Sequence, residues 1–184
     1  LYAGQVGPRG NVVASALAKE ADVILALGTR LGFNTTFYTY DNLSSTAKII
    51  QVEVEPTAIG RFFPVTEGIH GDAGTVASQL VRELRGHRAD ASSAWTKSFQ
   101  AKRKALLETR DREGDSQSDP IQPATLFRAL RAALPKDAMM TMDAGTLCLQ
   151  ATDQLLYHQP PALFTPLDFG LVGFSYACGL GVKL

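Results

Sequence analysis

The chain has 184 residues, of which 45% are hydrophobic and 20% charged, a composition typical of a globular protein with a packed core. Eighteen basic residues balance eighteen acidic residues, so the sequence lacks the excess positive charge of a nucleic-acid-binding surface. It contains no apolar run of about 18 residues, and we expect neither a membrane span nor a nucleic-acid or membrane partner.

The first half of the sequence alternates helix and strand patterns. NVVASALAKE at 11–20 predicts a helix with Asn11 as its N-cap. The apolar runs at 23–27 and 49–54 predict short strands that are buried on both faces, and GIHGD predicts a third edge of the same sheet. A helix capped by Asp72 follows. This alternation favours an α/β fold with a parallel sheet.

The middle of the chain, residues 85–120, carries many of the charges. AWTKSFQAKRKALLETRDREGD predicts a helix, and the polar stretch GDSQSDPIQP that follows contains two prolines. We interpret this region as an interdomain linker, with a long surface loop within one domain as the alternative.

A second α/β pattern begins after the linker. ATLFRALRAALP predicts an amphipathic helix ended by Pro135, and Ala138–Met142 predicts a strand that leads into Asp-Ala-Gly. LCLQATDQLLYH predicts a helix and ALFTPL an extended segment, and the Gly-rich stretch TPLDFGLVGFSYACGLGVKL predicts a terminal helix.

The two cysteines lie in apolar surroundings and form no CxxC motif. Cys148 and Cys178 are therefore predicted to be buried thiols of a cytoplasmic protein, with a disulfide or a ligand role as the alternative. The three histidines are scattered along the chain, so no cluster of His and Cys metal ligands is expected.

Glycine and acidic residues stand where the first predicted strands end. In a parallel sheet, ligands bind at the carboxyl ends of the strands, where a glycine admits a phosphate and an acid can hold a ribose hydroxyl. A nucleotide site is one interpretation, although no GxGxxG follows a strand, and plain turn glycines are the other. The residues concerned are Gly28, Thr29, Arg30, Glu53, Glu55 and Asp72.

The second half offers two further candidate segments. Asp143-Ala144-Gly145 ends a predicted strand, and Gly170 and Gly173 flank Leu171-Val172. Glycines at this spacing bring backbone groups close either to a ligand or to a neighbouring helix, and spacing alone leaves both interpretations open.

Several motifs in order carry a resemblance to a known family. ADVILALGTRLG, AKIIQVEVEPTAIGRFFPV and GIHGDAGTVASQL resemble the central domain of thiamine-diphosphate enzymes of the acetolactate synthase and benzoylformate decarboxylase type. IQPATLFRALRAALPKDAMMTMDAG and FGLVGFSYACGLGVK resemble the start of their C-terminal, diphosphate-binding domain.

The resemblance implies a domain organisation. Residues 1–88 would be the C-terminal part of an incomplete three-layer, Rossmann-like central domain, 89–122 a helical linker, and 123–184 the N-terminal part of a truncated thiamine-diphosphate-binding domain. The chain would then be a piece of a longer polypeptide.

The resemblance also assigns the candidate segments of the second half. Asp143, Gly145 and Thr146 match the turn near the diphosphate, although many acetolactate synthases have Gln-His where Thr146-Leu147 stand here. The segment Gly170-Leu171-Val172-Gly173 matches the one that cradles the aminopyrimidine. By that match the Gly170 carbonyl accepts from the 4′-amino group, the Val172 N–H meets a ring nitrogen, and the Val172 side chain is the wedge, usually a larger Met, Ile or Leu.

Other family features are implied only in part. The residues at the carboxyl ends of the first strands match the region where some members bind FAD or ADP. The family's Mg²⁺ is held by a Gly-Asp-Gly motif that this sequence lacks, so no metal ligand is assigned. No catalytic side chain is assigned either, because a turn or cap role is favoured for Asp143 and Asp168.

The implied parent is a lyase or transferase that decarboxylates or ligates 2-keto acids with thiamine diphosphate and Mg²⁺. We expect it to be a cytoplasmic homodimer or homotetramer, and the 184 residues alone to be inactive. The alternative hypothesis is a non-catalytic module that binds FAD or ADP, or serves as a scaffold.

Overall fold

The computed structural model describes residues 2–7, 10–88, 90 and 92–183. The chain divides into two compact units, Leu1–Lys102 and Arg103–Leu184, and the division falls within helix α4 (Ala94–Gly114). Residues 89 and 91 of the expected linker lie outside the described residues.

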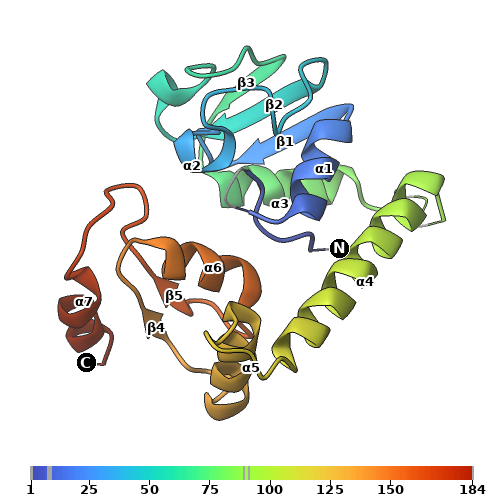
Figure 1. The fold of residues 1–184 in the computed structure, drawn as a ribbon. Helices are drawn as coiled ribbons and strands as arrows, with labels where there is room; N and C mark the ends of the chain where they lie inside the picture. Colours follow the sequence, from blue (N-terminus) through green and yellow to red (C-terminus); the bar gives the residue numbers. More distant parts are fainter. Residues whose placement is uncertain (1, 8–9, 89, 91, 184) are drawn as a thin grey trace. The chain divides into compact units, whose positions relative to one another are not determined.

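The first unit is built on a parallel sheet in the order β1-β2-β3 (Figure 1). The strands are β1 (Val23–Leu27), β2 (Lys48–Glu53) and β3 (Glu67–His70). Helices α1 (Val12–Glu20), α2 (Phe33–Thr36) and α3 (Ala73–Glu83) and the 3-10 turn η1 (Pro56–Ala58) accompany them. The structure confirms the predicted parallel α/β arrangement.

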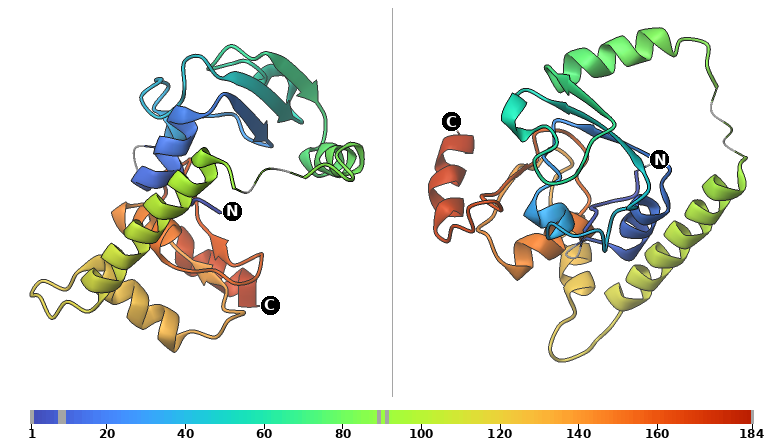
Figure 2. Two further views of the ribbon diagram at one scale, coloured as in Figure 1. Left: turned by 90° about the vertical axis from the view of Figure 1, so that its right-hand side faces the viewer. Right: turned by 90° about the horizontal axis from the view of Figure 1, so that it is seen from above.

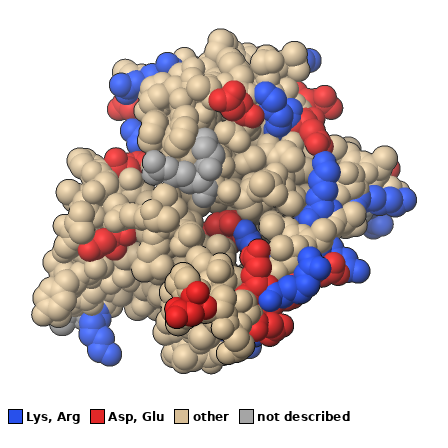
Figure 3. Space-filling model, viewed as in Figure 1, with Lys and Arg blue, Asp and Glu red and all other residues tan. Residues whose placement is uncertain are grey.

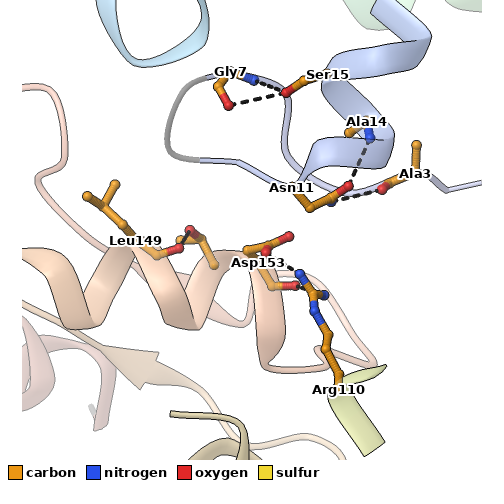
Figure 4. Close-up of polar contacts among 9 residues, drawn as sticks. Ala3, Gly7, Asn11, Ala14, Ser15, Arg110, Leu149 and Asp153 are labelled. Atoms are coloured by element: carbon orange, nitrogen blue, oxygen red, sulfur yellow. Dashed lines mark hydrogen bonds and ion pairs between the residues drawn. The ribbon is translucent and has the colours of Figure 1, made fainter. Parts of the chain in front are cut away.

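Helix α1 begins as the sequence predicts. The Asn11 side chain accepts a hydrogen bond from the Ala14 N–H at 2.8 Å and donates to the Ala3 carbonyl at 3.0 Å (Figure 4). The Ser15 hydroxyl bonds to both the N–H and the carbonyl of Gly7. These contacts satisfy amides that a helix start leaves without partners, and they hold the preceding segment against α1.

The core of the first unit lies on one side of β1. Ala26 and Ile49 pack with side chains from the connecting loops, namely Leu31, Leu43 and Phe63, all at most 6% exposed. The central strand β2 is covered on both faces, because Val52 and Gln51 are buried as well as Ile49.

Strand β1 departs from the prediction of burial on both faces. Val23, Leu25 and Leu27 are 54%, 44% and 38% exposed, whereas the alternating Ala26 is buried. β1 is an end strand of the described sheet, and its side chains on this face are only partly covered, whereas Val52, which pairs with Leu27 on the central strand, is fully buried. The continuous apolar run predicted the strand correctly, but the prediction that both of its faces are buried is wrong.

A buried amide ties together the loops that follow the strands. Gln51, 2% exposed within β2, donates from Nε2 to the carbonyls of Thr29 at 3.1 Å and Ala58 at 3.4 Å. Its Oε1 accepts from the Gly60 N–H at 2.8 Å. A buried polar group is stable only when it is hydrogen-bonded, and here the bonds tie the loop after β1 to the loop after β2.

The second unit has a small parallel sheet of β4 (Met140–Thr141) and β5 (Leu163–Phe164) (Figure 2). Its helices are α5 (Pro123–Ala133), α6 (Thr146–Gln154) and α7 (Phe174–Lys183). Phe127, Ala151 and Leu155 form its buried cluster. The expected strand at 138–142 is shorter than predicted, because only Met140 and Thr141 pair with β5.

The end of α4 is attached to α6 by an ion pair. The Arg110 guanidinium binds the Asp153 carboxylate and also donates to the Asp153 carbonyl at 3.2 Å (Figure 4). The two side chains are 20% and 11% exposed, so water screens the pair less than it screens a surface pair.

The charged surface and the two cysteines can be compared with the expectations from the sequence. Figure 3 shows Lys and Arg side chains interspersed with Asp and Glu on the face in view. None of the described helices is long and apolar enough to cross a membrane. Both cysteines are free thiols, and the prediction of burial is confirmed for Cys148, whereas Cys178 is only half-buried.

Replacing Gln51 should destabilise the first unit. Gln51→Leu keeps the side chain's approximate volume but leaves the Gly60 N–H and the Thr29 carbonyl without this partner, at a cost of about 2 kcal/mol in unfolding free energy. Urea denaturation measures it. Gln79→Leu, on the exposed surface of α3, is the matched control and should change stability by less than about 0.5 kcal/mol. Equal stability of the two variants would contradict the role given to Gln51.

Candidate functional site

The two candidate segments of the second unit lie against each other. Asp143 follows β4, and its Oδ1 accepts from the Ser175 N–H at 2.7 Å while its Oδ2 accepts from the Gly173 N–H at 2.9 Å. These bonds, with Ser175 first, hold the pKa of the Asp143 carboxyl below its ordinary value. The carboxylate thereby caps the start of α7, the role that the sequence favoured for Asp143.

The backbone next to Asp143 makes a further contact with the same segment. The Ala144 N–H donates to the Leu171 carbonyl at 3.0 Å. On the entry side, the N–H groups of Gly170 and Phe169 both bond to the Pro166 carbonyl, at 2.9 and 3.1 Å. The segment 170–173 is therefore held at its entry, its middle and its exit.

The glycines of both segments have backbone conformations that favour glycine. Gly145, Gly170 and Gly173 have φ values of 147°, 66° and 87°. A Cβ added at any of the three would meet none of the described atoms within 4 Å. The backbone is thus open to close approach, and the side chains of Leu171 and Val172 are 50% and 83% exposed. Open backbone beside an exposed apolar side chain fits the cofactor cradle that the resemblance implies.

Thr146 lies at a helix start, and Gly179 lies at a close packing contact. Thr146 begins α6, with Gly145 before it, so helix amides point toward the turn where a diphosphate is expected. Gly179 instead serves packing, because a Cβ there would lie 3.2 Å from Thr141 Oγ1 on β4. Close packing therefore applies to Gly179 within α7, and ligand access at the turn glycines stays a prediction.

The parallel register of the first unit brings the other candidate residues to one edge. The Gly28 N–H donates to the Val52 carbonyl at 2.9 Å, and the Gly71 N–H donates to the Glu53 carbonyl at 3.1 Å. Gly28 has a φ of 62°, and a Cβ there would lie 3.3 Å from the Ala73 Cβ, so this turn also packs closely against α3. Thr29 and Arg30 continue from this turn toward α2, which lies at the end to which the strands point (Figure 1).

Two of the acids at this edge cap local structure. Glu55 accepts from the hydroxyl and N–H of Thr57, and Asp72 accepts from the hydroxyl and N–H of Thr75. The threonine hydroxyl contributes most to lowering the pKa of each carboxyl. Glu53 accepts from the Val54 N–H at 3.0 Å. The sequence pattern could not separate capping from ligand binding. The hydrogen bonds show a capping role for Glu55 and Asp72.

An aromatic cluster borders the same edge, and the motif analysis missed it. Phe33 stacks on Phe37 with ring centroids 4.5 Å apart, and Tyr38 lies 4.6 Å from Phe62. The Arg61 guanidinium lies 5.3 Å from the Phe62 ring centroid. The aromatic density of FNTTFYTY and RFF was the available signal, but aromatic residues in loops also serve ordinary packing.

The described residues include no group of three or more His, Cys, Asp or Glu side chains that could hold a metal ion. Among these residues the structure therefore adds no metal ligand to the candidate site.

Acid should release the start of α7. The pKa of Asp143 is lowered, so its stabilising bonds are complete above the ordinary value of 3.8 and are lost as pH falls through the lower pKa of the folded chain. In an NMR titration from pH 6 to 2, the amide resonances of Gly173 and Ser175 should move together below pH 3.8. Asp143→Asn should abolish that movement, and its persistence would assign the titration to another group.

Comparison with known proteins finds a matching family model and several similar sequences. The family model described as thiamine pyrophosphate enzyme, central domain, matches residues 1–80. The whole chain is 34% identical to a sulfoacetaldehyde acetyltransferase of Roseovarius nubinhibens and 27% identical to an acetolactate synthase large subunit of Haemophilus influenzae. It spans 34% and 32% of the lengths of these two proteins.

A third relative extends the range of named activities. A probable 2-ketoarginine decarboxylase of Pseudomonas aeruginosa is 28% identical over 90% of the chain, which covers 28% of that protein. The chain thus spans about a third of the length of these relatives. Residues 1–80 match the central domain of thiamine pyrophosphate enzymes, and the chain as a whole is similar to an acetyltransferase, an acetolactate synthase and a probable decarboxylase.

Proposed function

We propose that the chain is part of a thiamine-diphosphate-dependent lyase or transferase that decarboxylates or ligates 2-keto acids. The matching family model and the names of the relatives support the cofactor and the substrate class. The observation that carries the proposal is the joining of the Asp143–Gly145 turn to the Gly170–Gly173 segment by backbone and carboxylate hydrogen bonds.

The residues of this site fit the cofactor through backbone groups and one apolar side chain. Gly170 offers its carbonyl, and Val172 offers its N–H and its exposed side chain as the wedge under the ring. Gly145 and Thr146 lie at the start of α6, where amides favour an anionic diphosphate. When bound, thiamine diphosphate supplies the electron sink for the carbon–carbon bond cleavage, and the chain's residues orient it.

The remaining parts of the proposal rest on the family resemblance. We place Mg²⁺ with the diphosphate, held by residues outside this sequence. We also expect a homodimer or homotetramer that works in the cytoplasm. The domain limits stay as proposed, with the central domain to residue 88, a helical linker at 89–122, and the diphosphate-binding domain from 123.

Loss of the Val172 side chain should weaken cofactor binding. In the full-length protein, Val172→Ala removes apolar surface from the proposed wedge, and the apparent Kd for thiamine diphosphate with Mg²⁺ should rise about three- to tenfold. Calorimetric titration measures it, and pyruvate turnover tests the reaction. Leu180→Ala, at an exposed position within α7, is the matched control and should leave the Kd unchanged. A wild-type protein that neither binds the cofactor nor converts any 2-keto acid would overturn the proposed function.

A nucleotide at the carboxyl edge of the first unit is a separate proposal. The parallel register, which brings Gly28, Glu53 and Gly71 together, supports it. FAD or ADP at about 100 times its Kd should raise the unfolding free energy by about 2.7 kcal/mol. Urea denaturation with each nucleotide, and with inorganic phosphate as control, checks this. Unchanged stability with both nucleotides would leave this edge as a set of local caps.

A further inference from the structure

The carboxylate of Asp143 is already engaged by the chain's own backbone. Both of its oxygens accept amide hydrogen bonds from the segment that leads into α7, at 2.7 and 2.9 Å. A carboxylate so engaged and negatively charged is poorly suited to contact an anionic diphosphate directly. Its function in the site is therefore to be sought in what it holds in place.

The bonds from the Asp143 turn determine which way the neighbouring peptide groups face. Leu171 C=O points to the Ala144 N–H, and in a trans peptide the C=O and the following N–H are antiparallel. The cis peptides of the described chain are at Asp119–Pro120 and Pro160–Pro161, so the 171–172 peptide is trans. The Val172 N–H is thus directed away from the Asp143 turn.

The same argument applies one residue later. The Gly173 N–H points to Asp143 Oδ2, so the carbonyl of Val172 faces away from that carboxylate. Together the Ala144 and Asp143 bonds turn the two peptides that flank Val172, and the Val172 side chain is left 83% exposed. The donor and the wedge assigned to the cofactor are therefore oriented from behind by the 143–144 turn.

We propose that Asp143 is a positioning residue, which holds Gly173 and Ser175, orients the peptide that follows Val172 and with it the Val172 side chain toward the cofactor, and makes no contact with the cofactor itself, while the adjacent Ala144 N–H orients the peptide that carries the Val172 N–H. This inference rests on the proposed function and deepens it, because it assigns to a side chain the geometry of a backbone site. Gly170 and Gly173 supply the φ values that the held segment requires.

The test uses the full-length protein and two substitutions of graded severity. Asp143→Asn keeps one acceptor oxygen, and Asp143→Ala removes both. The apparent Kd for thiamine diphosphate should rise about five- to tenfold in Asp143→Ala and less in Asp143→Asn, while the KM for the 2-keto acid at saturating cofactor stays within twofold. Hydrogen exchange of the peptide covering 170–176 should quicken in the same order without any ligand.

Asp153→Asn is the matched control for general destabilisation. It breaks the ion pair with Arg110 in the same unit but leaves the 170–173 segment untouched. It should lower the melting temperature and leave both the cofactor Kd and the exchange of 170–176 unchanged. Cofactor binding by Asp143→Ala that equals wild type would overturn the positioning role and leave the proposed function standing. Failure of wild type itself to bind would count against the proposed function instead.

Discussion

The candidate site of the second unit depends on two hydrogen bonds, which the Asp143 carboxylate accepts from the Gly173 and Ser175 N–H groups. The segment Gly170–Gly173 has a glycine at positive φ at each end, and the φ/ψ freedom of glycine makes such a segment costly to order. A carboxylate with two amide partners, supported by the neighbouring Ala144 N–H, supplies the order. The site is thus defined by backbone geometry, which a single acidic side chain holds.

In the first unit, carboxylates also accept backbone N–H hydrogen bonds, but there they cap the starts of helical elements. Parallel strands deliver their carboxyl ends to one edge, and the helices and turns that follow must satisfy their first amides. Glu55 and Asp72 do so for η1 and α3, and the buried amide of Gln51 joins the loop after β1 to the segment after η1. The sequence pattern suggests that Glu55 and Asp72 could hold a ribose hydroxyl, and the structure shows that both carboxylates cap local backbone.

Much of the fold could be predicted from the sequence, and the reasons are local. The apolar run of β1, the Asn11 and Asp72 caps, and Pro135 just after α5 each encode an element or its end within a few residues. The roles of Gln51 and Asp143 could not be derived in the same way, because their partners lie in other segments. Asp143 meets residues about thirty positions away. A polar residue in a strand and an acid in a turn are each compatible with many environments, and only the tertiary contacts choose one.

The open side of β1 has a consequence for the behaviour of these residues in water. One edge of β1 pairs with no described strand, and three of its apolar side chains are partly exposed, namely Val23, Leu25 and Leu27. Such an edge is a template for another strand. It carries no charged side chain to discourage such pairing. Copies of these 184 residues are therefore expected to associate through β1 under conditions in which each copy is still folded. The protein concentration would decide how much of this association takes place.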